Sequence, residues 1–384
     1  MRSSQTRPIA GLGWLTLLTT LTMAACGGQV TVQGSAPASV AAASGASVAS
    51  PASAKPAASA VAQPFSSPAA AAPAASQVSL KFVFSPPTAY SAAIFAAFDE
   101  GFFKKYGLDV ALTPSNSATV VQSVVSGEVP LAFGTATNGT NAIAEGAPFK
   151  LVASDGNFSG IVVVSRPEVQ SWSDLRGKTM AVSDPFSSSD VVTRLLLAKN
   201  GLVYNKDVKI LAMGSLSAQA AALESGQVAA AGLTPDIAVK LQSRGHRLLA
   251  NMAAIRIPLS DGGIYANNSY ARAHPEVVRG AIRSVWEGTR TVLTNYDVYT
   301  RVVRAHVKDL DDAQVKANYD VMSVLWGDPA NPRITPEAIA PIMDILSEPN
   351  PKVKSLKFAD IVDDSYVKQL NREGVFGGNG CQGC

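Results

Sequence analysis

The chain contains little cysteine, little histidine and little charge. Its 384 residues include three cysteines and three histidines, and only 16% of them are charged. The cysteines are Cys26, Cys381 and Cys384, so none lies in the body of the chain and a disulfide framework is excluded. Lys and Arg are scattered singly and the net charge is only +3. A basic stripe for nucleic-acid binding is therefore excluded as well.

The sequence also lacks the usual patterns of a catalytic centre. His246 follows a helix-like stretch, His274 precedes a proline and His306 stands in a helical stretch, and none has a partner for acid–base work nearby in the sequence. There is no metal-ligand spacing, phosphate loop or nucleophile elbow. We therefore expect no catalytic residues, no metal and no cofactor. The terminal Cys381-Gln382-Gly383-Cys384 is interpreted as an exposed tail, with metal binding or a tail disulfide as the alternative.

Long apolar runs are absent outside the N-terminus. Arg2 and Arg7 precede an apolar stretch, Ile9–Met23, which is too short to span a bilayer and is typical of a signal peptide. We expect a signal peptide at 1–25. The next segment, 26–77, is rich in Ala, Ser and Pro and has little to bury, so it is expected to be a flexible tether.

One pattern occurs twice in the chain, about 98 residues apart. Each copy alternates short apolar runs with helix-like stretches that end at glycine, which is typical of βαβ units and a mostly parallel sheet. Solenoid repeats are much shorter, so the spacing predicts two similar lobes. Apolar strands near 160–164 and 263–266 are interpreted as the crossings between them. The predicted divisions are 78–164 with 264–376 for a discontinuous lobe one, 165–263 for lobe two, and 377–384 for a Gly/Cys tail.

Ligands of open α/β sheets bind at the carboxyl ends of the strands. The six loops expected there are rich in hydroxyls and amides and contain no Lys or Arg. They are 85–90, 113–117 and 134–138 in lobe one, and 183–190, 213–217 and 232–236 in lobe two. An anion would have to be held by helix N-termini and by Ser, Thr and Asn. The best candidate for such a cradle is Ser187–Ser189, although these serines are equally suited to cap their own helix. Asp184, Asp190 and Asp236 are candidates to meet an amine, and Asp190 alternatively complements a helix dipole.

Two resemblances add to this interpretation. Met23-Ala24-Ala25-Cys26-Gly27 resembles a bacterial lipobox, which implies cleavage before Cys26 and a lipid on its sulfur; the alternative is a plain signal peptide. Four further segments, together covering parts of 80–325, resemble the solute-binding components of ABC importers for sulfonates, taurine, nitrate and thiamine-precursor pyrimidines. These segments are 96–110 (AAFDEGFFKKYGLDV), 125–129 (VSGEV), 144–153 (AEGAPFKLVA) and 174–182 (DLRGKTMAV).

The second resemblance implies a two-lobed type II periplasmic-binding-protein fold that closes on a small organic solute. It further implies an extracytoplasmic, lipid-anchored monomer that serves an ABC permease. Two alternatives remain open: a ligand sensor that docks on a membrane receptor, and an enzyme on the same scaffold related to the fungal pyrimidine synthase. The ligand-binding residues expected from the resemblance and from the serine cradle are Thr88, Tyr90, Ser115, Ser117, Thr135, Asn138, Ser187, Ser188, Ser189 and Asp236.

Overall fold

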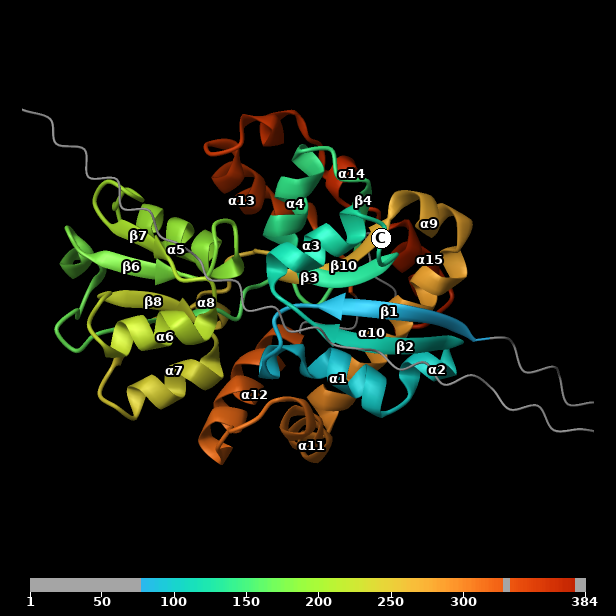
Figure 1. The fold of residues 1–384 in the computed structure, drawn as a ribbon, viewed down its shortest axis with the longest axis horizontal. Helices are drawn as coiled ribbons and strands as arrows, with labels where there is room; N and C mark the ends of the chain where they lie inside the picture. The colour runs from blue at the N-terminus through green and yellow to red at the C-terminus, as the bar shows by residue number, and fades with distance from the viewer. Residues whose placement is uncertain (1–76, 327–331, 377–384) are drawn as a thin grey trace, which may run out of the picture. The chain divides into compact units, whose positions relative to one another are not determined.

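The computed structural model describes residues 77–326 and 332–376, which form two mixed five-stranded sheets flanked by helices (Figure 1). The chain divides into two units, Met1–Ala69 and Ala70–Cys384, and every described residue belongs to the second. The predicted signal peptide, nearly all of the tether with Cys26, and the tail with Cys381 and Cys384 therefore lie outside the described residues.

The first sheet has the strand order β2-β1-β3-β10-β4. Its strand β1 runs parallel to β2 and β3, whereas β10 runs antiparallel to both of its neighbours. Four strands thus share one direction, and their carboxyl ends meet at one edge of the sheet. The strands are β1 (Val78–Phe84), β2 (Leu108–Pro114), β3 (Leu131–Thr135), β4 (Phe149–Ser154) and β10 (Gly262–Asn267).

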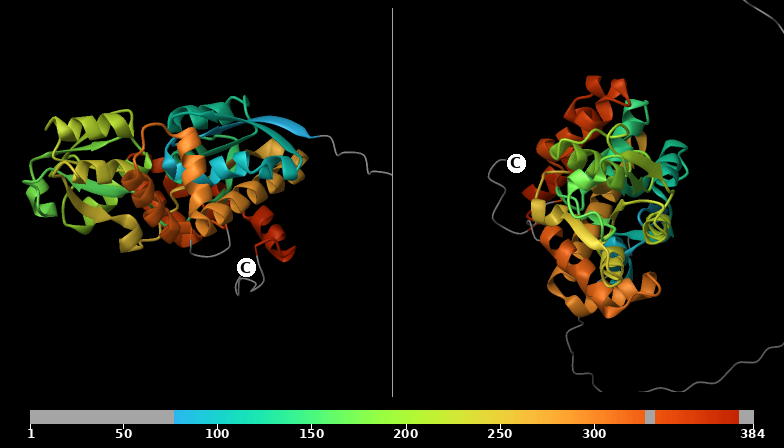
Figure 2. Two further views of the ribbon diagram at one scale, coloured as in Figure 1. Left: turned by 90° about the horizontal axis from the view of Figure 1, so that it is seen from below. Right: turned by 90° about the vertical axis from the view of Figure 1, so that its left-hand side faces the viewer.

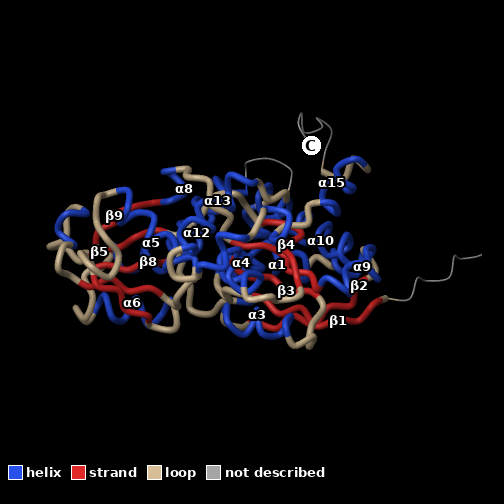
Figure 3. The backbone as a smooth tube through the Cα atoms, turned by 90° about the horizontal axis from the view of Figure 1, so that it is seen from above, coloured by secondary structure: helices blue, strands red, loops and turns tan. Residues whose placement is uncertain are grey.

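The second sheet repeats this arrangement in the order β7-β6-β8-β5-β9, with β5 as the antiparallel strand. Strand for strand, the two orders are equivalent, which confirms the two-lobed α/β architecture predicted from the sequence repeat. Figure 3 shows the strands of both sheets with helices around them. The strands are β5 (Val162–Ser165), β6 (Thr179–Val182), β7 (Lys209–Ala212), β8 (Ala230–Leu233) and β9 (Arg247–Asn251).

The two antiparallel strands are exchanged between the lobes. Strand β5 follows β4 of the first sheet but pairs with β8 and β9 of the second. Strand β10 follows β9 of the second sheet but pairs with β3 and β4 of the first. The predicted lobe boundaries at 164/165 and 263/264 therefore fall inside these strands, because backbone pairing assigns all of β5 to the second sheet and all of β10 to the first.

Helices of the first lobe cover both faces of its sheet. The helical stretch between β1 and β2 consists of a 3-10 turn and two α-helices, and Gly101, in a left-handed conformation with φ 73°, separates α1 from α2. Figure 2 shows the orange C-terminal helices close to the cyan helices that follow β1, in accord with the contact between α1 and α10. The first-lobe helices are η1 (Ala89–Ser91), α1 (Ala92–Asp99), α2 (Phe102–Lys105), α3 (Ser117–Val125), α4 (Ala136–Ala144), α9 (Asn268–Ala273), α10 (Pro275–Thr294), α11 (Tyr296–His306), α14 (Phe358–Ile361) and α15 (Ser365–Arg372).

Two C-terminal helices contact both lobes. Apolar side chains of α13 share one buried cluster with α5 of the second lobe and with residues of the first sheet. Helix α12 contacts α7, where the Gln314 Nε2 donates to the carbonyl oxygen of Asp236 at 3.2 Å. Both helices lie in the segment 264–376 that was predicted as part of lobe one, and they also contact the second lobe. The remaining helices are η2 (Trp172–Leu175), α5 (Ser188–Lys199), α6 (Leu216–Glu224), α7 (Pro235–Gln242), α8 (Met252–Ile255), α12 (Asp312–Trp326), α13 (Pro336–Ser347) and η3 (Pro351–Ser355).

Candidate functional site

A cavity of about 320 Å³ lies where the carboxyl ends of strands from both sheets meet. The loops after β1, β2 and β3 line it from the first lobe, and the loops after β6, β7 and β8 line it from the second. The segments around 155–161 and 261–262, where the chain crosses between lobes, complete the lining. We call this cavity the cleft. Its lining residues are Ser85, Pro86, Pro87, Thr88, Tyr90, Ser115, Asn116, Ser117, Phe133, Gly134, Thr135, Asp155, Ile161, Ser183, Asp184, Ser187, Ser188, Ser189, Gly214, Ser215, Leu216, Ser217, Thr234, Asp261 and Gly262.

Most of the expected ligand-binding residues come together in this lining. The structure places eight of the ten there: Thr88, Tyr90, Ser115, Ser117, Thr135, Ser187, Ser188 and Ser189.

The two other expected residues, Asn138 and Asp236, do not line the cleft. Asn138 lies in the first turn of α4, where its backbone N–H donates to the Oγ1 of Thr135 at 3.3 Å. Asp236 is the second residue of α7 and is only 3% exposed. Burial raises the pKa of its carboxyl group. Helix α12 packs over this turn, so the third loop of the second lobe reaches the cleft through Thr234 instead.

The serines after β6 hold their own loop together. Ser187 is the N-cap of α5, and its Oγ accepts from the backbone N–H of Asp190 at 3.3 Å. Ser189 Oγ accepts from the backbone N–H of Ser183 at 2.9 Å and lies 3.0 Å from Ser187 Oγ. Within the part of the chain that the structure describes, Ser188 Oγ makes no such bond and lines the cleft. Ser187 and Ser189 thus bond within their own loop, whereas Ser188 faces the cleft without such a bond in the described residues.

This division gives a prediction for two matched alanine variants. Ser187→Ala removes an N-cap and should lower the free energy of unfolding by about 1 kcal/mol. Ser188→Ala should leave the free energy of unfolding within about 0.5 kcal/mol of wild type. It should lower the affinity for a bound solute by about fivefold, because one hydrogen bond contributes about 1 kcal/mol. Urea denaturation and calorimetry measure the two effects. Equal loss of stability in both variants would contradict the assignment.

A buried hydrogen-bond cluster lies where the chain crosses between the lobes. The Tyr90 hydroxyl donates to Asp261 Oδ2, and the same oxygen accepts from Ser159 Oγ at 3.2 Å and from the Gly160 backbone N–H at 3.3 Å. Burial, followed by the negative charges of Asp261 and Asp155, holds the pKa of Tyr90 well above its usual range. Tyr90 is therefore a fixed donor that ties the loop after β1 to both crossings.

Asp155 lies beside this cluster, but one of its carboxyl oxygens has no hydrogen-bond partner in the described residues. This oxygen, Oδ1, is buried. Burial and then the charge of Asp261 raise the pKa of Asp155 to about 7, opposed only in part by the backbone N–H groups of Asp155 and Gly262. An orphaned carboxyl oxygen in a cavity wall is costly unless something pairs with it.

Asp155 and Asp261 were absent from the sequence-based site. A signal for them exists, because the tripeptide Ser-Asp-Gly occurs at both crossings, at 154–156 and at 260–262. The structure brings the two copies together: Ser154 Oγ and Ser260 Oγ lie 3.3 Å apart.

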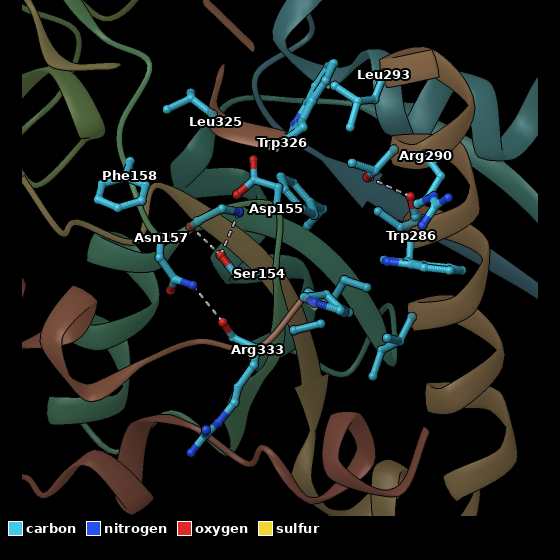
Figure 4. Close-up of a pocket in the computed structure, with 18 of the residues that line it drawn as sticks. Ser154, Asp155, Asn157, Phe158, Trp286, Arg290, Leu293, Leu325, Trp326 and Arg333 are labelled. Carbon is cyan, nitrogen blue, oxygen red and sulfur yellow. Dashed lines mark hydrogen bonds between the residues drawn. The ribbon is translucent and has the colours of Figure 1, made fainter. Parts of the chain in front are cut away.

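A second cavity, of about 420 Å³, lies within the first lobe (Figure 4). Trp286 and Arg290 of α10 line it together with Trp326 of α12 and the loop after β4. Asp155 and Phe133 line both cavities, so Asp155 stands in the wall between them. The Trp326 Nε1 is buried without a partner in the described residues.

In the described residues, neither histidine nor a cluster of metal-ligating side chains is found at the cleft. None of the three histidines lines either cavity; His306, for example, stacks on Phe95 and contacts Asp99 at 2.9 Å. Within 77–326 and 332–376 no group of His, Cys, Asp and Glu is arranged to hold a metal ion. In the same residues no helix has the length and apolar character needed to cross a bilayer.

Comparison with solved structures supports the fold. The putative sulfonate ABC transporter periplasmic binding protein SsuA of Methylobacillus flagellatus matches with a TM-score of 0.63 at 19% identity, covering 79% of this chain and 96% of that one. The ligand-binding component of an ABC-type import system from Staphylococcus aureus matches with a TM-score of 0.63 at 14% identity, covering 76% and 99%. The periplasmic aliphatic sulphonate-binding protein SsuA of Escherichia coli has a TM-score of 0.60 at 16% identity, covering 75% and 91%. The chain therefore has the fold of periplasmic solute-binding proteins.

Sequence comparison identifies the family. Among curated proteins, 4-amino-5-hydroxymethyl-2-methylpyrimidine phosphate synthase of Saccharomyces cerevisiae is 31% identical over 109 residues, which cover 27% of this chain and 32% of that protein. The match thus spans about a third of the curated relative's length. A family model described as NMT1/THI5 like matches residues 88–297, more than half of the chain. The chain belongs to the NMT1/THI5 like family.

Proposed function

We propose that this protein is an extracytoplasmic solute-binding protein that captures a small organic ligand between its two lobes for an ABC importer. In this proposal the processed chain is a monomer held at the membrane by a lipid on Cys26, and the Ala/Ser/Pro-rich tether keeps the folded body away from the bilayer surface.

One observation carries the proposal: a cleft of about 320 Å³ is lined by loops from the strand ends of both sheets. The equivalent sheet orders make the two halves of this lining counterparts of each other. Binding at the carboxyl ends of strands is the general rule for open α/β sheets, and the volume suits a small organic molecule. The solved periplasmic binding proteins that share this fold also support solute binding as the role of the cleft.

The connections between lobes suit a closing motion. In the described residues, the chain passes from one sheet to the other in the segments before β5 and before β10, and connections of a few residues of this kind act as hinges. Because each lobe contributes part of the lining, a ligand gains its full set of contacts only when the lobes approach. It therefore shifts the equilibrium toward the closed state by its differential affinity.

The expected result is that a small solute raises the melting temperature of the full-length protein and reduces its radius of gyration. Thermal shift across sulfonates, carboxylates, pyrimidines, aromatic acids and amines finds the ligand class, and small-angle scattering measures closure. Ligand bound only to the folded state at a hundred times its Kd adds about 2.7 kcal/mol to stability. Conversion of the bound solute into product would contradict capture and favour an enzyme, a role suggested by the synthase relatives. Absence of any shift in every class would also contradict it.

A further inference from the structure

The cleft carries acidic groups and no basic ones. Asp155, Asp184 and Asp261 line it, and no Lys, Arg or His is among its described lining residues. On the far side of Asp155, the cations of the second cavity are engaged elsewhere: Arg333 Nε pairs with Asp364 at 3.2 Å, and the Arg290 guanidinium lies 5.4 Å from the Trp286 ring centre. An anionic ligand would therefore meet repulsion without a side-chain cation to offset it.

Helix N-termini are the remaining means of holding an anion. Four helices, α3, α4, α5 and α6, begin at N-cap residues that line the cleft: Asn116, Thr135, Ser187 and Ser215. Each N-cap side chain already accepts from a backbone N–H in the first turn of its own helix. Each cap therefore occupies one first-turn donor, so these helix ends offer an anion fewer backbone N–H groups than uncapped ends would, and no cationic side chain of the described lining adds to them.

The carboxyl pair at the crossings, Asp155 and Asp261, includes an acceptor that has no donor in the described residues. The Asp261 Oδ2 already accepts three hydrogen bonds, whereas the buried Oδ1 of Asp155 accepts none. The nearby Asp261 charge also raises the pKa of Asp155. Once the Asp155 side chain turns this oxygen toward the cleft, a positively charged N–H group of a ligand would pair with it and relieve the repulsion between the two carboxyls.

We infer that the ligand captured in the cleft carries a protonated nitrogen, an ammonium or amidinium group, which binds to Asp155 beside Asp261. This inference rests on the proposed role of the cleft as a solute site. The rest of the ligand would lie against Pro86, Phe133, Ile161 and Leu216, the apolar part of the lining. The ligand class therefore differs from the sulfonates named for the solved binding proteins of this fold.

Titration of Asp155 gives the inference a pH signature. The titratable groups that share a cavity lining with it are Tyr90, Asp184 and Asp261 in the cleft. Arg290 and Arg333 share the lining of the second cavity with it. With the pKa of Asp155 at about 7, the group is mostly protonated at pH 6 and mostly ionised at pH 8. Because a cation binds the ionised form, its affinity should rise about tenfold from pH 6 to pH 8. A neutral or anionic ligand should not show this rise.

The test uses the full-length protein and three single-ring probes of similar size: benzylammonium, benzyl alcohol and phenylmethanesulfonate. Calorimetry at pH 6, 7 and 8 compares wild type with Asp155→Asn, and Asp320→Asn on the exposed face of α12 is the matched control. We expect benzylammonium to bind best. Asp155→Asn should weaken it tenfold or more and abolish the pH dependence, whereas Asp320→Asn should change neither.

Other results would overturn either the cation inference or solute capture itself, and the two failures can be told apart. Tighter binding of the sulfonate or the alcohol, or an ammonium affinity that Asp155→Asn does not alter, would overturn the cation inference and leave solute capture intact. If no probe binds and the wider panel of solute classes gives no thermal shift, solute capture falls and the inference falls with it. The Asp155→Asn variant should fold, because Asn avoids an ionised carboxyl in a buried position; above pH 7 its melting temperature should equal or exceed that of wild type.

Discussion

Replacing Asp190 with Ala should lower the free energy of unfolding by about 3–5 kcal/mol, because it leaves a mostly buried arginine without its partner. Asp190 is fully buried in the first turn of α5. Its Oδ2 accepts from Arg194 Nε at 3.1 Å and from the Phe186 backbone N–H at 2.9 Å, and its Oδ1 accepts from the Tyr204 hydroxyl. The Arg194 guanidinium also lies over the Tyr204 ring, 3.6 Å from its centre.

Urea denaturation measures this loss, with two variants as controls. Tyr204→Phe keeps the ring under Arg194 and removes one donor, so it should cost about 1 kcal/mol. Asp320→Ala removes a carboxylate from an exposed ion pair with Lys316 and should cost at most about 1 kcal/mol. A loss below about 1 kcal/mol in Asp190→Ala would show that the contacts of Asp190 with Arg194 and Tyr204 do not stabilise the second lobe.

The same substitution should also disturb the cleft. Phe186 has a positive φ of 65°, which is strained for an aromatic residue, and its backbone N–H is held by Asp190. Ser187–Ser189 follow directly and line the cleft. Loss of Asp190 should therefore weaken solute binding although its side chain does not line the cavity. The sequence left open whether Asp190 meets a ligand amine or supports its helix, and its burial and partners assign it to support.

The sequence predicted the duplicated architecture because the repeat marks turns with a strict conformational requirement. Gly107 and Gly201 have φ of 76° and 68°, and Gly127 and Gly226 have φ of 77° and 81°. At such positions a side chain is strained whereas glycine is not, so both copies retain glycine where each helix ends. With the strand patterns between them, these glycines define the order and length of the elements.

The unforeseen features depend on tertiary contacts. The apolar runs at β5 and β10 predict strands, but they do not show that each strand pairs with the sheet of the other copy. Asp236 follows a strand like a typical ligand-binding residue, yet α12, about 80 residues later, packs over it. Asp155 and Asp261 lie in the crossings, outside the six loops that the strand-end rule selects, and only the folding of both lobes brings them together.

Replacing Gly288 with Ala should destabilise the protein by about 2–3 kcal/mol, although in an exposed helix the same change adds about 1 kcal/mol of stability. Gly288 lies in the interior of α10, where this helix crosses α1. A Cβ there would stand 2.1 Å from the Ala93 carbonyl oxygen and 2.9 Å from the Ala97 backbone nitrogen. Both atoms belong to the backbone of α1, so the helices themselves must separate.

Gly280→Ala is the control within the same helix. Its Cβ would lie 3.2 Å from the Tyr106 carbonyl oxygen and 3.4 Å from Leu108 Cδ1, contacts that small shifts can relieve, so its stability should stay within about 1 kcal/mol of wild type. If Gly288→Ala were as stable as Gly280→Ala, the close crossing of α1 and α10 would be wrong.

The Gly288→Ala substitution should also affect the cleft, because α1 is directly connected to it. Helix α1 continues from the turn that carries Tyr90, whose hydroxyl bonds Asp261. Displacing α1 should therefore loosen the carboxyl pair and weaken solute binding together with the fold.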